Sequence, residues 1–368
     1  MRNHRKLMAF GLTILGIGCL LRQTPLAAED PPADVQQMVT QGVTFLENSQ
    51  LASGAFHDQA EPGVTALVTT ALLKSGKTPA DPSVAKALDY LQTFVRDDGG
   101  IYREGSFYRN YETSLSLLCF VEANQQGQFD ELIQNATRFL RGIQWDEGEH
   151  IDETHYAYGG AGYGKHKRPD LSNTQFLIEA LKSSENEENR EAIQRALVFV
   201  SRCQNLETAD NTTPFAAKNP DGGFYYTPAA GGTSQAGETP SGGLRSYGSM
   251  TYAGLKSMIY AGVDPDDPRV QAAIGWISNN YDLSQNPGMG DSGLYYYYHT
   301  FAKALGTLGK PTVVDAEGEV HDWQVDLITS LQNAQQADGS WVNRNERWME
   351  GEPNLVTAYA LLALSYCQ

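Results

Sequence analysis

The densest group of acidic side chains lies in VDPDDPRV, where Asp264, Asp266 and Asp267 fill three of four positions. Carboxyl groups this close together shift one another's pKa and can form a strong proton donor. The segment GKTPADPSV, residues 76–84, aligns with this one, and of the three acids only Asp267 is matched, by Asp81. Each matched aspartate precedes a proline that suits the first helical position, so we expect its carboxylate to cap free N–H groups. We therefore interpret the cluster as a hinge between helices.

Histidine and tyrosine provide the other candidates for proton transfer. Tyr298 and His299 are adjacent in GLYYYYHT, and His155 follows a run of loop acids. A carboxylate and a histidine in one pocket can perform general acid–base catalysis. These three residues are the catalytic candidates, and for His299 a purely structural role stays open.

Tyrosines and tryptophans are concentrated in the Gly-rich loops and at the starts of helical segments. Aromatic faces stabilise carbocations, stack on sugars and seat apolar chains, although tyrosine also packs well at helix junctions. The ligand-binding candidates are Tyr156, Tyr158, Tyr163, Tyr225, Tyr226, Tyr247, Tyr295, Tyr297, Trp341 and Trp348.

A local basic cluster, GKHKRPD, directly precedes an apolar helical segment. Lys165, Lys167 and Arg168 next to a helix N-terminus could hold a diphosphate or another anion. An exposed loop that balances nearby acids is the alternative interpretation.

The N-terminus has the features of an export signal. A cationic stretch precedes the apolar run LMAFGLTILGIGCLL, and TPLAAED offers a cleavage site after Ala28. We expect residues 1–28 to be removed and the rest to be exported to the periplasm or secreted, with no later segment apolar enough to span a membrane. An uncleaved anchor is the alternative.

Composition excludes several classes of partner. The formal net charge is −17, and removal of the signal takes away four basic residues, which leaves −21. Such a surface repels nucleic acid and anionic lipid. Three cysteines remain, Cys119, Cys203 and Cys367, and we expect free, mainly buried thiols because the count is odd and the spacing fits no metal motif.

The elements that must position these residues come from an internal repeat. Six amphipathic helical segments end in GVTFL at Leu46, ALDYL at Leu91, ATRFL at Leu140, ALVFV at Val200, AIGWI at Ile277 and LITSL at Leu331. Each is followed by a loop and an apolar helix, with signatures TALVTTAL, TSLSLLCF, TQFLIEAL, TYAGLKSM, YHTFAKAL and TAYALLAL. A helix that is apolar on nearly all faces must be surrounded by protein. We predict one domain, residues 29–368, in which an outer ring of six amphipathic helices surrounds an inner ring.

Two loops share one spacing: FL-x3-Q-x3-G-x-F begins at Phe45, and SL-x3-Q-x3-G-x-W begins at Ser330. The segment from Tyr90 keeps this frame with altered residues, and so does the segment that carries Gly148 and His150. The pattern resembles the QW repeat of the prenyltransferase and squalene-cyclase superfamily, whose fold is an α/α toroid. The glutamine can tie the outer helix end to the loop backbone, the glycine permits a tight turn, and the aromatic ring fills the gap between repeats.

The resemblance also implies chemistry that this sequence does not fully reproduce. Class II terpene cyclases use a D-x-D-D acid, and the only such string here is the linker already interpreted as a hinge. Protein prenyltransferases hold zinc through Asp, Cys and His; Tyr298-His299-Thr300 resembles the His element, but Tyr247 and Ser249 stand where Asp and Cys are expected. Three protein ligands are the usual minimum, so we expect no metal and no cofactor.

We therefore predict an exported toroid that binds an apolar, isoprenoid- or terpenoid-like ligand in a Tyr-rich central cavity, with cyclase or transferase activity left open. A non-catalytic scaffold that binds a ligand or a protein, and a polysaccharide-acting enzyme, are the alternatives, and the sequence does not identify a protein partner. The Gly-, Ser- and Thr-rich stretch at about 204–246 is either a lid over the cavity or a disordered insertion.

Overall fold

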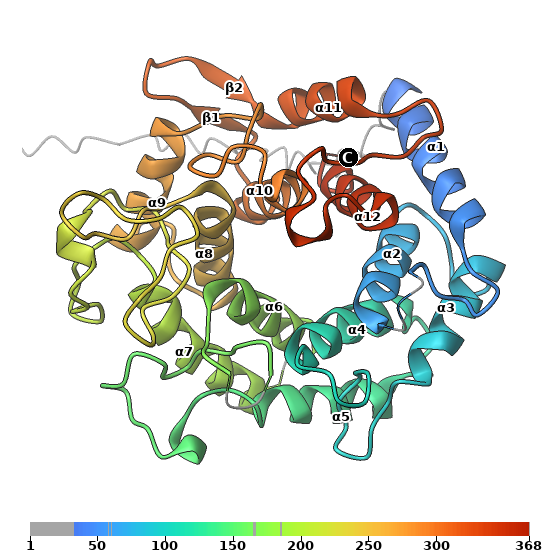
Figure 1. The fold of residues 1–368 in the computed structure, drawn as a ribbon, viewed down its shortest axis with the longest axis horizontal. Helices are drawn as coiled ribbons and strands as arrows, with labels where there is room; N and C mark the ends of the chain where they lie inside the picture. The colour runs from blue at the N-terminus through green and yellow to red at the C-terminus, as the bar shows by residue number, and fades with distance from the viewer. Residues whose placement is uncertain (1–32, 58, 60, 165–166, 185, 368) are drawn as a thin grey trace, which may run out of the picture. The chain divides into compact units, whose positions relative to one another are not determined.

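The computed structural model describes residues 33–367 except 58, 60, 165, 166 and 185. The predicted signal peptide lies outside the described residues. Within them, twelve α-helices form two concentric layers (Figure 1).

The outer helices are α1 (Ala33–Ser49), α3 (Pro82–Gln92), α5 (Asp130–Arg141), α7 (Glu187–Arg202), α9 (Pro268–Asn279) and α11 (Trp323–Ala334). The inner helices are α2 (Pro62–Lys74), α4 (Arg109–Ala123), α6 (Leu171–Lys182), α8 (Gly248–Tyr260), α10 (Leu294–Leu308) and α12 (Pro353–Leu364). Three short 3₁₀ helices, η1 (Glu147–Glu149), η2 (Ala216–Lys218) and η3 (Arg347–Met349), and one hairpin of β1 (Thr312–Val314) and β2 (Val320–Asp322) complete the described elements.

The inner layer is closed. Each inner helix packs against the inner helices before and after it, and α12 packs against α2, so the last pair meets the first (Figure 1). The prediction of an all-α toroid, an α6/α6 barrel of six helix pairs, is confirmed. The division into layers follows from composition, because ten of the twelve residues of α12 are buried whereas α5 buries only Ile133, Ala136, Thr137 and Leu140.

A threonine near the start of five inner helices fixes the preceding loop. Its hydroxyl oxygen accepts a hydrogen bond from the backbone N–H of the residue that closes the turn. The pairs are Thr65 with Phe56, Thr113 with Ile101, Thr174 with Ala161, Thr251 with Phe224 and Thr357 with Trp341, all at 3.0–3.1 Å. The recurrent threonine of the inner-helix signature is therefore structural.

The glutamine of the repeat makes two ties. As predicted, it binds the loop backbone, and the structure adds a second bond to the next outer helix. Gln335 Nε2 donates to Gly339 O at 3.0 Å and to Met38 O in α1 at 3.0 Å, which joins the two ends of the ring. Gln50 and Gln204 form the same pair of bonds at their own seams.

The third repeat differs from the predicted frame. Gln144 Nε2 donates to Gly159 O at 2.8 Å, not to a turn at Gly148. Gly159 has φ +80°, and a Cβ there would lie 1.8 Å from Arg195 O of α7. Gly148 instead lies in η1, with His150 directly after it. The identical spacing at Gly148 was a coincidence, because an inserted loop displaces the true turn glycine by eleven positions.

The prediction that the matched aspartates cap helices is correct for one of the two. Asp267 caps α9, with its carboxylate accepting from the backbone N–H of Arg269 at 2.8 Å. Asp81 does not cap α3; its carboxylate accepts from the backbone N–H and hydroxyl of Thr78. The capping prediction was wrong for Asp81 because the threonine hydroxyl competes for the same oxygen.

The stretch from Gln204 to Ser246 folds over the loop face of the ring (Figure 1). Asn205 Nδ2 donates to Leu244 O at 2.7 Å and to the Ser246 hydroxyl at 2.9 Å, so the two ends of the stretch are held together. It has little regular secondary structure, and side chain–backbone bonds of this kind take the place of a regular ladder for several of its polar groups.

The structure also places the cysteines and bears on membrane-spanning segments. Cys119 and Cys203 are buried free thiols, and Cys367 is a partly exposed one. None of the helices in the described part of the chain has the length and apolarity that a membrane crossing requires.

Candidate functional site

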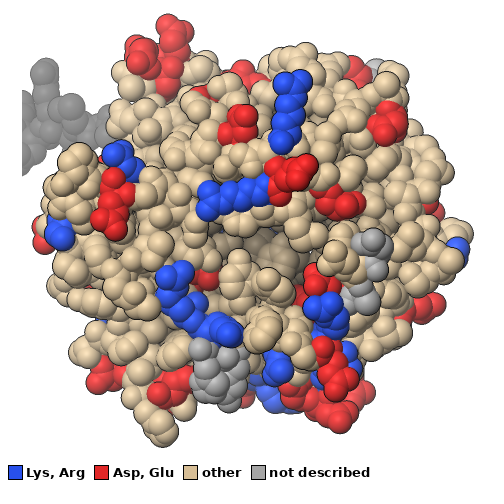
Figure 2. Space-filling model, viewed as in Figure 1, with Lys and Arg blue, Asp and Glu red and all other residues tan. Residues whose placement is uncertain are grey.

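A cavity of about 430 Å³ lies inside the ring, at the N-terminal ends of the inner helices. Figure 2 shows a hollow at the centre of the loop face. We call this space the central cavity. Among the described residues its aromatic lining consists of Tyr108, Tyr111, Tyr163, Phe176, Tyr226, Tyr247, Tyr296, Trp348 and Tyr359.

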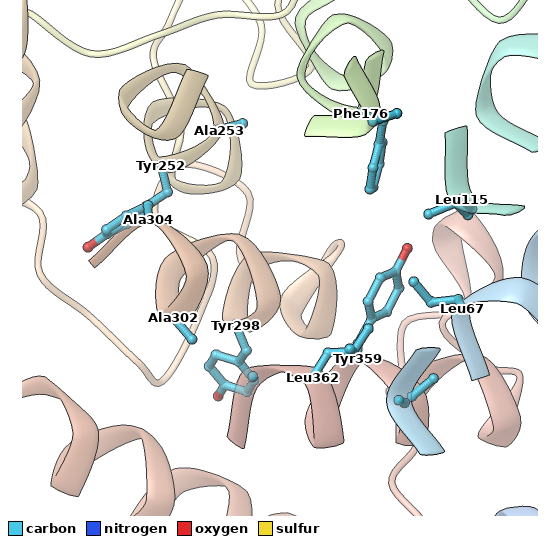
Figure 3. Packing of buried hydrophobic residues seen from close by; sticks show 14 of the residues in the cluster. Leu67, Leu115, Phe176, Tyr252, Ala253, Tyr298, Ala302, Ala304, Tyr359 and Leu362 are labelled. Carbon is cyan, nitrogen blue, oxygen red and sulfur yellow. The ribbon is translucent and has the colours of Figure 1, made fainter. Parts of the chain in front are cut away.

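The rings of the wall contact one another across different helices. The ring of Phe176 packs edge-on against Tyr111, with centroids 5.3 Å apart, and lies 6.2 Å from Tyr296. The hydroxyls of Tyr111 and Tyr359 are 3.3 Å apart. Figure 3 shows the side chains of Phe176 and Tyr359 pointing toward each other. Because these side chains come from α4, α6, α10 and α12, closure of the ring assembles the wall.

Three carboxyl groups line the cavity, Glu61 at the mouth and Glu112 and Glu350 further in. Glu112 accepts hydrogen bonds from the Ser106 hydroxyl at 2.9 Å and the Arg103 backbone N–H at 3.1 Å. Glu350 accepts from the backbone N–H of Tyr296 at 2.8 Å, at the start of α10. Burial raises the pKa of the Glu112 and Glu350 carboxyl groups, against the effect of their hydrogen bonds.

A fourth carboxyl group, Asp170, lies behind the aromatic wall without lining the cavity. Asp170 caps α6, accepting from the backbone N–H of Asn173 at 2.9 Å and its Nδ2 at 2.8 Å. Tyr226 and Tyr163 lie near this carboxyl group and interact with it electrostatically. Burial raises the pKa of Asp170 to about 6. Asp170 therefore lies behind Tyr226, whose side chain lines the cavity.

The sequence of this chain matches that of a known protein family. The family model of the squalene-hopene cyclase C-terminal domain matches residues 32–227, more than half of the chain. The chain belongs to this family. The predicted kinship with the prenyltransferase and squalene-cyclase superfamily is confirmed. No curated protein matches the sequence significantly.

Solved structures of several activities share the cyclase-type toroid. A type II terpene cyclase variant from Scytonema, in complex with geranylgeranyl dihydroxybenzoate as substrate, is similar over 91% of this chain and 97% of its own, at 14% identity and TM-score 0.54. A polysaccharide lyase is similar over 91% and 96%, at 9% identity and TM-score 0.56. A glycosyl hydrolase family 88 protein from Bacteroides vulgatus is similar over 90% and 98%, at 10% identity and TM-score 0.55. Identities this low establish the fold alone.

Four of the predicted ligand-binding residues line the central cavity of this cyclase-family chain: Tyr163, Tyr226, Tyr247 and Trp348. They come from three loops and from the residue that precedes α8. The sequence could indicate these four because each lies in the segment between an outer helix and the inner helix that follows it.

The other predicted aromatic residues lie elsewhere. Tyr225, Tyr297 and the catalytic candidate Tyr298 donate their hydroxyls to backbone oxygens of Arg202, Asp282 and Leu283. Trp341 Nε1 donates to Leu331 O, so its ring is part of the seam between repeats, while Tyr295 is buried against Tyr298. Tyr158 donates to Glu147 and Tyr156 is exposed. None of these side chains lines the cavity. For Tyr295, Tyr297 and Tyr298 the reason is that successive residues of a helix face different directions.

The two candidate histidines are far from equivalent. His299 is 3% exposed, and burial lowers its pKa to about 3, so the ring is neutral at pH 7. It lines a second cavity at the other end of the ring, with its ring centroid 5.7 Å from that of Tyr359. His155 lies in a surface loop, where its Nδ1 accepts from the Ala157 backbone N–H, outside both cavities.

The basic cluster is split. Lys165 lies outside the described residues. The Lys167 amine lies 4.8 Å from the centroid of the Phe107 ring, and the Arg168 guanidinium lies 5.8 Å from that of Tyr226 and donates to Thr233. Arg168 is thus adjacent to the cavity wall, while Lys167 lies over the exposed ring of Phe107, which does not line the cavity.

The residues present do not fit a catalytic zinc ion. Tyr247 and Ser249 line the central cavity, whereas His299 opens into the other one. No three His, Cys, Asp or Glu side chains among the described residues are grouped to hold a metal. The donor set of the prenyltransferases is therefore not assembled here.

The sequence reasoning missed the deepest part of the wall, which consists of Tyr111, Phe176, Tyr296 and Tyr359, together with Glu112. All five lie within the first seven residues of an inner helix. The available signal was an aromatic residue in the first two turns of an apolar helix, since those turns surround the axis of a closed ring.

Proposed function

We propose that the central cavity binds an apolar, isoprenoid- or terpenoid-like ligand. The observation that carries this proposal is the ring of nine aromatic side chains around a space of about 430 Å³. Cavities of this size and composition are typical of sites for small apolar ligands. The terpene cyclase from Scytonema holds a geranylgeranyl compound in the same fold, which supports this ligand class.

The lining sets the orientation of the ligand. Gln59, Glu61 and Gln235 belong to the loops at the mouth, whereas Phe176, Met250 and Leu355 belong to inner helices. A polar end group is solvated at the mouth, and the hydrocarbon chain lies against the apolar helices. Burial of this chain provides the driving force, at about 25 cal/mol per Å².

The same site supports acid-initiated cyclisation. In this reaction the protonated Asp170 passes a proton through the Tyr226 hydroxyl to an alkene carbon, and a new C–C bond forms at the resulting carbocation. The faces of Tyr111, Phe176 and Tyr296 stabilise the cation. A carbon next to the final cation returns a proton to the Asp170–Tyr226 pair, so the product is an isomer of the substrate and no co-reactant is consumed. His299 takes no part in it.

A binding experiment tests the proposal. Geranylgeraniol should quench the tryptophan fluorescence of the wild type and bind at micromolar concentration. Trp348→Ala, which removes a cavity wall, should weaken binding at least tenfold when it is measured by calorimetry. Tyr156→Ala removes an exposed ring outside the cavity and should bind as the wild type does. Absence of binding by any prenyl alcohol would overturn the proposal.

Turnover is tested separately. Incubation with linear prenyl substrates at about pH 5–6, followed by mass spectrometry, should yield cyclic isomers, and Asp170→Asn should abolish them while it preserves binding. Recovery of unchanged ligand with wild-type activity absent would favour a non-catalytic binding protein.

A second candidate function is action on a carbohydrate. It is favoured by Glu112 and Glu350, two buried carboxyl groups that line the cavity, and by the similarity to polysaccharide-acting toroids. Release of reducing sugars from uronic acid oligosaccharides, lost in Glu112→Gln, would select this candidate over the first.

A further inference from the structure

The second cavity, of about 270 Å³, lies at the C-terminal ends of the inner helices. One side of it is apolar and includes Leu115, Leu118, Val121 and Leu362. Phe176 lines both this space and the central cavity, so a single ring helps to separate them. Figure 3 shows Phe176 beside Leu115 in this region. The proposed function makes no use of the second cavity.

The charges around the second cavity are unbalanced. Glu179 is 6% exposed and pairs with two amines, Lys256 at 2.7 Å and Lys303. Lys256 is 1% exposed, and Lys303 is largely buried. One carboxylate therefore faces two amines in the interior, and the two carry excess positive charge whenever both are protonated. At the opening, Lys74 and Glu122 form a pair at 2.6 Å, which adds no net charge.

Helix dipoles do not compensate for this excess. The negative end of a helix stabilises cations only within the last turn. Lys74 and Lys182 lie in the last turns of α2 and α6, but Lys256 and Lys303 lie before the last turns of α8 and α10. An unbalanced buried cation is costly, and a bound anion would remove that cost. The excess is local, because the chain as a whole carries −17.

A polar group beside these amines lacks a partner. His299 is 3% exposed and lines the second cavity, and its Nδ1 has no hydrogen-bond partner. Buried polar groups are nearly always hydrogen-bonded, so an orphaned imidazole nitrogen indicates that the site is incomplete. The imidazole, the Lys303 amine and the apolar wall all border the same space.

We propose that the second cavity binds an organic anion: a carboxylate with a short apolar body. The carboxylate pairs with the Lys303 ammonium and hydrogen-bonds the His299 imidazole, and the body packs on the four aliphatic side chains named above. This site differs from the central cavity in position and in chemistry. Here a charged head group is held inside the ring, whereas the polar end of the ligand in the central cavity lies at the mouth.

Calorimetry with three probes tests the proposal. Octanoate has both the charge and the body, octanol has the body alone, and inorganic phosphate has charge alone. Octanoate should bind the wild type at least tenfold more tightly than either of the others. Equal affinity for octanol, or no binding of octanoate, would overturn the proposal.

Variants locate the octanoate. Lys303→Met keeps the length of the side chain and leaves Glu179 with one lysine, a balanced pair, so the variant should fold. It should bind octanoate at least tenfold more weakly, whereas Lys310→Met on the exposed surface should bind as the wild type does. Trp348→Ala, which damages only the central cavity, should also leave octanoate affinity unchanged. Unchanged affinity in Lys303→Met, or a loss in Trp348→Ala, would contradict the assignment.

Discussion

The two ends of the ring differ in the buried ionisable side chains that they hold. At the loop end, Asp170 is a carboxyl group whose pKa burial raises to about 6, next to the aromatic wall. At the other end, burial pulls the pKa of Lys256 and Lys303 below the usual value for an amine, while Glu179 pairs with both. Both ends therefore hold groups whose pKa burial shifts toward neutral pH.

Asp170 should make stability depend on pH with a definite sign. Its pKa rises from 3.8 to about 6 on folding, so it favours the folded state most below pH 3.8, and this contribution is lost as the pH rises through about 6. Two pKa units correspond to about 3 kcal/mol. The unfolding free energy of the wild type, relative to Asp170→Asn, should fall by this amount between about pH 4 and pH 6. Denaturant titrations at several pH values measure it, and a difference that rises with pH would contradict it.

The lysine pair predicts unequal effects from two neutral substitutions. Glu179→Gln leaves two ammonium groups without a carboxylate and should lower the free energy of unfolding by about 3–5 kcal/mol. Lys303→Met leaves one balanced ion pair and should change it by less than about 1 kcal/mol. Urea unfolding of both variants measures this difference. Equal losses in the free energy of unfolding would show that Glu179 is not coupled to the two lysines.

At the scale of elements, the repeat consists of a helix pair and a tie to the next pair. Gln50, Gln144, Gln204 and Gln335 each donate to a loop oxygen and to the next outer helix. The turn glycine permits this contact, as at Gly54, where a Cβ would lie 2.3 Å from Lys86 O. These residues orient successive helix pairs, so they carry structure rather than chemistry.

Gln335→Ala should show the contribution of one tie. It removes two hydrogen bonds at the seam between α11 and α1 and should lower the free energy of unfolding by about 1–3 kcal/mol. Gln336→Ala removes an exposed side chain next to it and should have an effect within about 0.5 kcal/mol. Thermal unfolding of the two variants compares them. If Gln336→Ala lowered the free energy of unfolding as much as Gln335→Ala does, the two hydrogen bonds of Gln335 would not be the cause of the loss.

At the scale of the whole molecule, closure of the ring creates two cavities that no single repeat contains. Their common wall includes Phe176, which lies on α6 and contacts Tyr111 on α4. The size of ligand that the central cavity accepts therefore depends on a side chain at its deep end.

Phe176→Ala should connect the cavities. The free energy of unfolding should fall by about 3–5 kcal/mol, as for other buried phenylalanines. The matched control Phe199→Ala, at a fully buried position of the outer helix α7, should cost about as much. Only Phe176→Ala should shift the preferred prenyl alcohol toward longer chains, which a calorimetric series from geraniol to geranylgeraniol measures. The same shift in Phe199→Ala would contradict this role for the shared wall.

The sequence by itself determined the architecture of this protein. Helical periodicity, the contrast between amphipathic and apolar segments, and the Gln–Gly–aromatic spacing are local properties, and they predicted six helix pairs and a closed ring. The same patterns identified Tyr163, Tyr226, Tyr247 and Trp348 as residues near the cavity mouth.

Only the tertiary structure decided which side chains face a cavity and which ionise. Tyr296 and Tyr297 are neighbours of one type, yet the first lines the central cavity and the second binds Asp282 O. Likewise, Asp170 and Lys303 are ordinary residues in the sequence, and their environments arise only where helices far apart in the chain meet. Direction along a helix and burial depend on the packing of all twelve helices, and no local pattern records that packing.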